Sequence, residues 1–212
     1  TAERARGMAA RVAAPRAPQG GVGRDGHGAG GPLRVAAARV HAPIDSTVAQ
    51  VRQTAMWGSM RSGPSALCLS RQNLPRLTDV AMVDSIRHGG YVLSDMPGAK
   101  AVLVATGSET SLAMEAQAAL AAEGIPTRVV SMPCTNVFDR QPVAYQESVL
   151  PLSLPTVAIE AAHPDFWRKY VGRTGAVVGM PTFGESAPAK DLYAHFGITS
   201  QSVVKAVKTL AS

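Results

Sequence analysis

The chain has 212 residues, 46% hydrophobic and 17% charged, a composition suited to one globular domain or to a domain with a remnant of another. Its net charge of +6 is concentrated in residues 1–60, which carry eight Arg, no Lys and three acids, whereas residues 61–212 carry thirteen cations and twelve acids. The near-neutral larger part gives no reason to expect a nucleic-acid partner, and no apolar run reaches the ~20 residues that span a membrane.

Residues 1–62 form a low-complexity segment. Ala, Gly, Arg and Pro make up 35 of the first 60 residues, and Phe and Tyr are absent there. Such a composition cannot bury enough apolar surface to offset chain entropy, so we expect this segment to be disordered. An Arg-rich stretch without Lys is also what an out-of-frame reading of GC-rich DNA produces, and we favour that origin; a basic nucleic-acid-binding arm is the alternative.

A glycine pattern in this segment matches a dinucleotide-binding loop in spacing only. Gly21, Gly23 and Gly26 fit the pattern, and Asp45 follows at a suitable distance. The motif needs a buried strand before its first Gly and a helix after it, but residues 15–19 contain two prolines and further glycines follow the loop. We therefore expect no cofactor to bind here.

Apolar runs alternate with helical patterns from residue 63 onward. Strands are predicted at 65–69, 90–93, 101–105, 127–131, 156–160 and 175–179. Helices are predicted at 108–124, 142–149, 164–170, 188–195 and from 199 to the C-terminus, after a linker at 75–89 with a helical turn. Strands separated by helices of this length predict an α/β fold, with a mostly parallel sheet and helices on both faces.

The helix predicted at 108–124 has a recognisable start and an apolar face. Ser108 is placed as an N-cap and Glu109 lies at the positive helix end. The apolar face is expected to consist of Leu112, Ala116, Ala119 and Leu120. Backbone N–H groups of the preceding turn could bind an anion, but a simple helix start is the preferred interpretation.

Several short phrases follow one another in a specific order. They are Ser-Arg-Gln-Asn-Leu at 70–74, Ala-Thr-Gly-Ser-Glu at 105–109, Val-Ser-Met-Pro at 130–133, Phe-Asp-Arg-Gln at 138–141 and Phe-Gly-Glu-Ser-Ala-Pro at 183–188. Together they resemble the C-terminal part of transketolase. The resemblance implies that residues 63–88 are a remnant of the pyrimidine-binding domain with its linker, and that residues 89–212 are the C-terminal domain.

The resemblance also implies an activity. Transketolase is a homodimer that moves a two-carbon ketol unit from a ketose phosphate to an aldose phosphate, using thiamine diphosphate and a divalent cation, Mg or Ca. In the family, the diphosphate motif, the catalytic Glu and the aromatic residues around the thiamine ring lie upstream of this region. We therefore expect this chain alone to bind no cofactor and to be inactive, and we assign it no catalytic, cofactor-binding or metal-binding residue.

Arg71 is the one residue assigned to substrate binding. It follows a predicted buried strand, at the position where open α/β sheets place ligand crevices. A guanidinium offers several donors in one plane and suits a phosphate dianion. The resemblance implies that Arg71 contacts the phosphate of the sugar substrate; a surface ion pair is the alternative.

Other reactive side chains are given structural roles. Ser186 lies outside a Gly-x-Ser-x-Gly motif, so we expect it to pack or cap at the helix that starts at Pro188. The five His lack the spacing of a zinc site. Cys68 and Cys134 belong to no CxxC or Cys/His cluster, so we expect reduced core thiols in a cytoplasmic protein.

Two further functions stay open on the sequence. One is a stand-alone α/β binding or regulatory module with a basic N-terminal arm. The other is the C-terminal domain of another thiamine-dependent enzyme, such as dihydroxyacetone synthase. The phrases at 70–74 and 183–188 favour transketolase over a dehydrogenase β-subunit or a deoxyxylulose-phosphate synthase.

Overall fold

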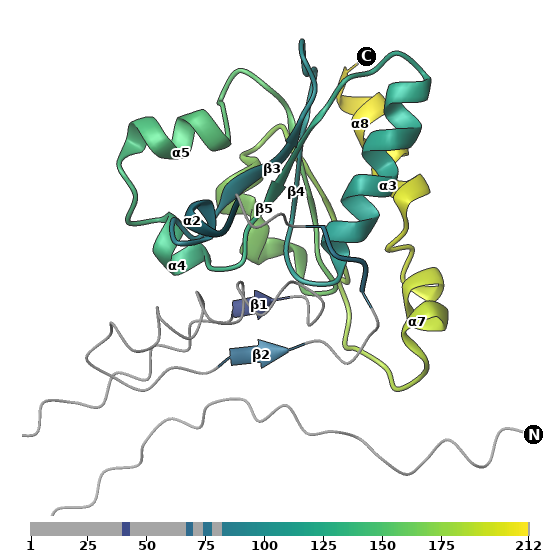
Figure 1. The fold of residues 1–212 in the computed structure, drawn as a ribbon. Coiled ribbons are helices and arrows are strands. Elements are labelled where there is room, and N and C mark those ends of the chain that lie inside the picture. Colours follow the sequence, from purple (N-terminus) through teal and green to yellow (C-terminus); the bar gives the residue numbers. More distant parts are fainter. Residues whose placement is uncertain (1–39, 43–66, 70–73, 78–81, 212) are drawn as a thin grey trace, which may run out of the picture.

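The computed structural model describes residues 40–42, 67–69, 74–77 and 82–211 (Figure 1). Of the segment expected to be disordered, all but three residues therefore lie outside the described residues. Those three form strand β1 (Val40–Ala42), which pairs in parallel with β2 (Leu67–Leu69). The disorder expected of residues 1–62 stays a prediction.

The main sheet has five strands in the order β3-β5-β4-β6-β7. They are β3 (Tyr91–Asp95), β5 (Arg128–Ser131), β4 (Val102–Ala105), β6 (Thr156–Ile159) and β7 (Ala176–Val178). Three pairings are parallel, and β3 runs antiparallel to β5 at one edge. The predicted mostly parallel sheet is confirmed.

The central strand β4 explains why the domain has two apolar cores. All four of its side chains are fully buried. Because side chains alternate along a strand, Leu103 and Ala105 join the core on one face, while Val102 and Val104 join the core on the other. The uninterrupted apolar run that predicted this strand thus reflects burial on both sides.

One face of the sheet is covered by α3 (Glu109–Ala122) and α8 (Ser200–Ala211) (Figure 1). The start of α8 is capped as predicted, because Thr199 Oγ1 accepts the N–H of Ser202 at 3.2 Å. The apolar face predicted for α3 is wrong in part: its buried apolar residues are Ala113, Ala116 and Leu120, whereas Ala119 is exposed. Alanine occurs on every side of this helix, so hydrophobic periodicity could not identify the side that meets the sheet.

The other face carries short helices that the sequence resolved less well. They are α4 (Thr135–Phe138), α5 (Val143–Val149), the 3-10 turn η2 (Pro164–Trp167) and α6 (Arg168–Val171). The prediction of one helix at 164–170 is wrong, since a 3-10 turn precedes a single α-helical turn there. Helix α4 was missed because four residues are too few for a periodic pattern. The two remaining helices of the described residues are α2 (Val83–Ile86), which precedes β3, and α7 (Ala189–His195), which precedes α8.

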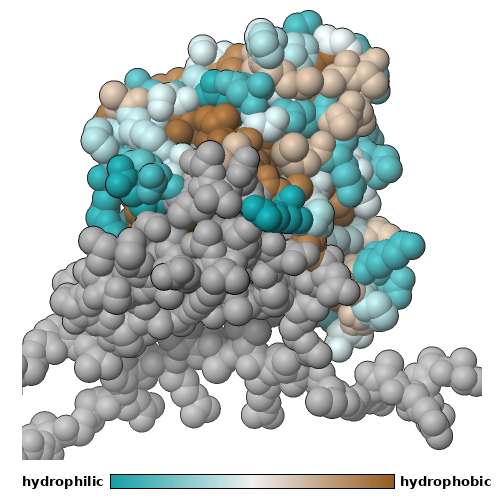
Figure 2. All heavy atoms as spheres, viewed as in Figure 1, coloured by the Kyte–Doolittle hydropathy of each residue, from teal (hydrophilic) through white to brown (hydrophobic). Residues whose placement is uncertain are grey.

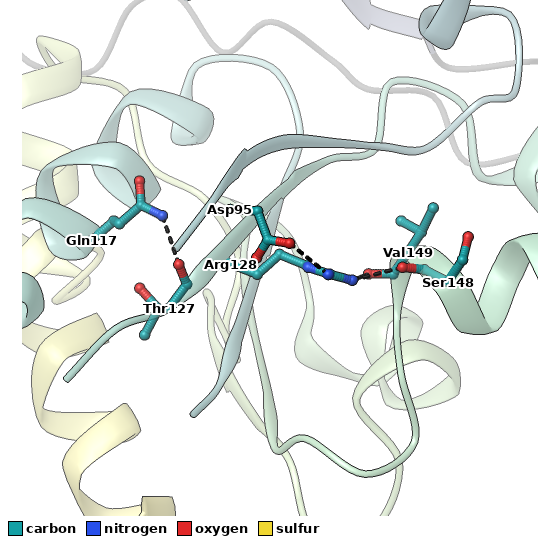
Figure 3. Close-up of polar contacts among 6 residues, drawn as sticks. All are labelled: Asp95, Gln117, Thr127, Arg128, Ser148 and Val149. Carbon is teal, nitrogen blue, oxygen red and sulfur yellow. Dashed lines mark hydrogen bonds and ion pairs between the residues drawn. The ribbon is translucent and has the colours of Figure 1, made fainter. Parts of the chain in front are cut away.

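Polar side chains close the sheet where the parallel strands begin, here called the amino edge (Figure 3). Arg128, the first residue of β5, donates from Nη2 to Asp95 Oδ2 at 2.6 Å and from Nη1 to the carbonyl of Ser148 at 2.6 Å. Gln117 Nε2 donates to the carbonyl of Thr127 at 2.7 Å. These contacts tie β5 to β3, to the end of α5 and to α3.

The surface is mixed in polarity. On the face seen in Figure 1 and Figure 2, hydrophobic residues gather near the centre of the described part, with hydrophilic residues around them. No helix in the described part of the chain is long and apolar enough to cross a membrane.

Candidate functional site

The opposite end of the sheet, here called the carboxyl edge, is where β4, β5 and β6 finish side by side. After β4 the chain turns to α3 on one face, whereas after β5 and β6 it turns to helices on the other face. Open α/β sheets bind ligands at such a switch point, because diverging connections leave a crevice between them.

A cavity of about 440 Å³ lies at this carboxyl edge. Its volume falls within the range of ligand pockets. It is lined by segments that follow three different strands: Thr106 after β4, residues 132–136 after β5, and residues 160–167 after β6. The lining residues are Thr106, Met132, Cys134, Thr135, Asn136, Glu160, Ala162, His163, Phe166 and Trp167.

Aromatic rings form one wall of the cavity. Trp167 is 1% exposed, and its indole N–H donates a hydrogen bond to Glu160 Oε2. Phe166 is 56% exposed and meets Trp167 edge to face, with ring centroids 5.7 Å apart. Tyr170 lies behind Trp167 at 5.5 Å. The indole N–H fixes the Glu160 carboxylate beside the ring wall.

The charge of the lining is negative. Glu160 is acidic, and the residues that line the cavity include neither Lys nor Arg. At the mouth, His163 Nδ1 lies 3.5 Å from Asp165 Oδ2. Lys169 on α6 is paired with Asp139, with Nζ and Oδ2 2.7 Å apart. The cavity therefore offers a carboxylate, hydroxyls, an amide and aromatic rings.

Glycines press the chain that enters β3 against one wall of this cavity. The carbonyl of Gly89 accepts the N–H of Cys134 at 2.9 Å. A Cβ added at Gly89, where φ is +83°, would lie 2.4 Å from the carbonyl oxygen of Cys134, and one at Gly90 would lie 2.4 Å from Met132 Sδ. A side chain at Gly89 would overlap backbone atoms of the wall, and one at Gly90 would require the Met132 side chain to move.

A second polar cluster fills the turn between β4 and α3. The Glu109 side chain is buried, and its Oε1 accepts the hydroxyl of Tyr193 at 2.7 Å and the N–H of Ala161 at 3.2 Å. Ser108 Oγ donates to Oε2 at 3.0 Å. Ser108 occupies the N-cap position as predicted, but its side chain makes no cap hydrogen bond. The buried carboxylate is therefore held by two hydroxyls and one backbone N–H.

The loop at 181–188 projects from the described surface. Ser186 is exposed, and Phe183 is 97% exposed. The helix after Pro188 begins as predicted, but it has no side-chain cap. The packing or capping role expected for Ser186 is therefore wrong, because its side chain stays in solvent.

The structure places only some of the remaining predicted residues. Arg71 lies outside the described residues, so its substrate-binding role stays a prediction. Cys134 is a buried thiol in the cavity wall, and the side chain of Cys68 is outside the described part. Sequence reasoning missed the cavity itself, because its residues come from three separate loops and form no motif. Among the described residues, no group of three His, Cys, Asp or Glu could hold a metal ion.

Comparison with known proteins identifies the family of this fold. The family described as "Transketolase-like TK C-terminal domain" matches residues 89–199. Transketolase 2 of Aliivibrio fischeri is 49% identical over 167 residues, which cover 76% of this chain and 25% of that protein. Residues 63–212 make up less than 76% of this chain, so the aligned region must begin upstream of Gly63.

Solved structures agree with this result. Transketolase from Leishmania mexicana superposes with a TM-score of 0.71 at 43% identity, covering 78% of this chain and 24% of that one. A split gene transketolase, described as an inactive beta4 tetramer, has a TM-score of 0.58 at 27% identity and covers 78% of this chain and 56% of that one. The chain spans about a quarter of the length of the curated relative, and it belongs to the transketolase family through its C-terminal domain.

Proposed function

We propose that this chain is the C-terminal part of a transketolase, and that the complete enzyme transfers a two-carbon ketol unit from a ketose phosphate to an aldose phosphate. The match of residues 89–199 to the family's C-terminal domain is the observation that carries the proposal. On the resemblance, we place the enzyme in the pentose phosphate pathway of carbohydrate metabolism, in the cytoplasm and as a homodimer.

In that proposal, thiamine diphosphate with a divalent cation supplies the carbanion chemistry. The described residues do not fit this cofactor. The cavity at the carboxyl edge presents the Glu160 carboxylate, with neither Lys nor Arg in its lining, and a diphosphate would be repelled there. In the proposal the described domain therefore takes no part in the catalytic steps, and it contributes structural support and a dimer contact.

A second arrangement is a transketolase divided between two polypeptides, with this chain as the C-terminal partner. The likeness to the split gene transketolase favours it. The experiment measures ketol transfer from xylulose 5-phosphate by the chain alone, by the chain mixed with a polypeptide carrying the two upstream domains, and by a covalent fusion of the two.

The three samples separate the outcomes. With cofactor and Mg²⁺ present, we expect no turnover by the chain alone. Activity on mixing supports a divided enzyme, whereas activity only in the fusion supports a single polypeptide. A well-folded fusion without any turnover would overturn the transketolase proposal.

Arg71 provides a local test within an active fusion. Charge-assisted hydrogen bonds of this kind contribute roughly 1.5–3 kcal/mol, so Arg71→Ala should lower kcat/KM for xylulose 5-phosphate about tenfold or more. Hydroxypyruvate has no phosphate, so kcat/KM for this substrate should fall much less in the same variant. Arg87→Ala, at an exposed position, is the matched control and should leave kcat/KM unchanged for both substrates. Equal losses on both substrates would contradict the phosphate contact.

A further inference from the structure

We propose that the cavity at the carboxyl edge binds a small organic ammonium ion, a role separate from sugar-phosphate transfer. The cavity has well-fixed inner walls. Met132 and Trp167 are almost completely buried, and Cys134 is held by its backbone hydrogen bond to Gly89. The exposed residues Phe166 and His163 lie toward solvent. A ligand therefore meets a space that is already formed, which lowers the ordering cost of binding.

Charge determines which ligands this space accepts. Glu160 places a carboxylate in the lining, and the indole N–H of Trp167 fixes its orientation. Since neither Lys nor Arg is among the lining residues, a phosphate or carboxylate ligand would face repulsion without a compensating partner. A cation gains an ion pair instead.

The aromatic wall favours an organic cation. The faces of Trp and Phe attract ammonium groups within about 6 Å of the ring centroid. Phe166 and Trp167 stand at 84° to each other, so their rings present two surfaces of different direction. The same aromatic cluster already holds one ammonium group: Lys169 Nζ lies 5.5 Å from the ring centroid of Tyr170.

The polar side chains favour a ligand with N–H or O–H donors. Thr106, Thr135 and Asn136 are among the residues that line the cavity. Their oxygen atoms can accept hydrogen bonds from an ammonium group or from a neighbouring hydroxyl. A primary ammonium that carries a hydroxyl, as in an amino alcohol, therefore matches the lining better than a quaternary ammonium does.

The test is calorimetric titration of the full chain with ethanolammonium chloride, using tetramethylammonium chloride, sodium chloride and sodium phosphate at matched ionic strength. We expect saturable binding of ethanolammonium with a dissociation constant on the order of 1 mM, weaker binding of tetramethylammonium, and none of sodium or phosphate. Because Trp57 and Trp167 are the two Trp residues of the chain, the variant Trp57→Phe lets Trp167 fluorescence report on the same site. Transferase activity is not measured, so the result is independent of the proposed function.

Matched variants locate the site. Glu160→Gln should weaken ethanolammonium binding about tenfold or more, whereas Glu115→Gln, an exposed carboxylate on α3 across the sheet, should leave it unchanged. If Glu160→Gln loses its fold by near-ultraviolet circular dichroism, Phe166→Leu replaces it, because that side chain is half-exposed, and it should weaken binding severalfold. Absence of saturable binding, equal binding of phosphate, or full affinity in the folded cavity variants would overturn the proposal.

Discussion

The two edges of the same parallel sheet use polar side chains in opposite ways. At the amino edge, Arg128 pairs with Asp95, and Arg128 and Gln117 each donate to a backbone carbonyl. At the carboxyl edge, Glu160, Thr106 and Asn136 line an accessible cavity. Groups whose hydrogen bonds are made within the protein stabilise the fold, whereas groups that line a cavity can also contact a ligand. Substitutions at the amino edge should therefore change unfolding, and those at the cavity should mainly change binding.

Arg128→Met should give the largest effect on stability. It removes charge-assisted contacts to the carbonyls of Ser148 and Val149 and to the carboxylate of Asp95. Asp95 is 42% exposed in its side chain, so the ion pair itself contributes less than about 1 kcal/mol. The hydrogen bonds to carbonyls dominate, and we expect the free energy of unfolding to fall by about 2–3 kcal/mol in urea titration.

Asp95→Asn is the matched control at the amino edge and should cost less than about 1 kcal/mol. Ethanolammonium binding should be unchanged in both variants. A loss of ligand affinity in Arg128→Met that exceeds its loss of stability would contradict the separation of the two edges.

Tyr193→Phe tests the polar cluster around Glu109, the part of the carboxyl edge that does not line the cavity. The change removes the hydroxyl that donates to the buried Glu109 carboxylate, and we expect a loss of about 1–2 kcal/mol in the free energy of unfolding. Ser108→Ala removes a second donor to the same group. The two changes should be non-additive in a double-mutant cycle measured by urea unfolding, because both act on one carboxylate. Strict additivity would show that the cluster does not act as a unit.

Alkaline pH should weaken the domain through the aromatic cluster behind the cavity. Burial raises the pKa of Tyr170, and the neighbouring carboxylate of Asp139, which accepts its hydroxyl at 3.0 Å, raises it further. The folded state therefore keeps this phenol neutral while the unfolded state ionises from about pH 10. The resulting stability is complete below pH 10 and declines above it. Tyr170→Phe should show a shallower decline in urea midpoints between pH 9 and 11; an unchanged slope would exclude Tyr170 as the cause.

Thr127→Val should have the smallest effect. Within the described residues, the buried Thr127 Oγ1 has no hydrogen-bond partner, while the Thr127 carbonyl keeps its bond from Gln117. Removing an unsatisfied buried hydroxyl should leave stability unchanged or raise it by up to about 1 kcal/mol. Thermal unfolding checks this, and a clear drop in Tm would show that the hydroxyl has a partner.

The sequence predicts strands and helix starts where one local pattern dominates. The apolar run of β4 and the cap at Thr199 belong to this group, because burial on both faces and a helix N-terminus each leave a local signature. Ala119 was misplaced because alanine carries little information on the direction of a helix face.

The site was less accessible to sequence reasoning. The cavity brings together Thr106, Asn136 and Glu160, which are far apart in the chain and meet only when β4, β5 and β6 align. The family phrases identified the domain but not this grouping. The predicted phosphate contact of Arg71 lies outside the described residues and depends on domains upstream of this one.

The two glycines at the start of β3 give the domain a fixed point of attachment. Gly89 and Gly90 pack so closely against the Cys134 carbonyl and the Met132 sulfur that no side chain fits between them, and both Cys134 and Met132 line the cavity. A side chain added at either glycine would therefore displace atoms of the cavity wall, so the path of the chain into β3 and the shape of the cavity are set together.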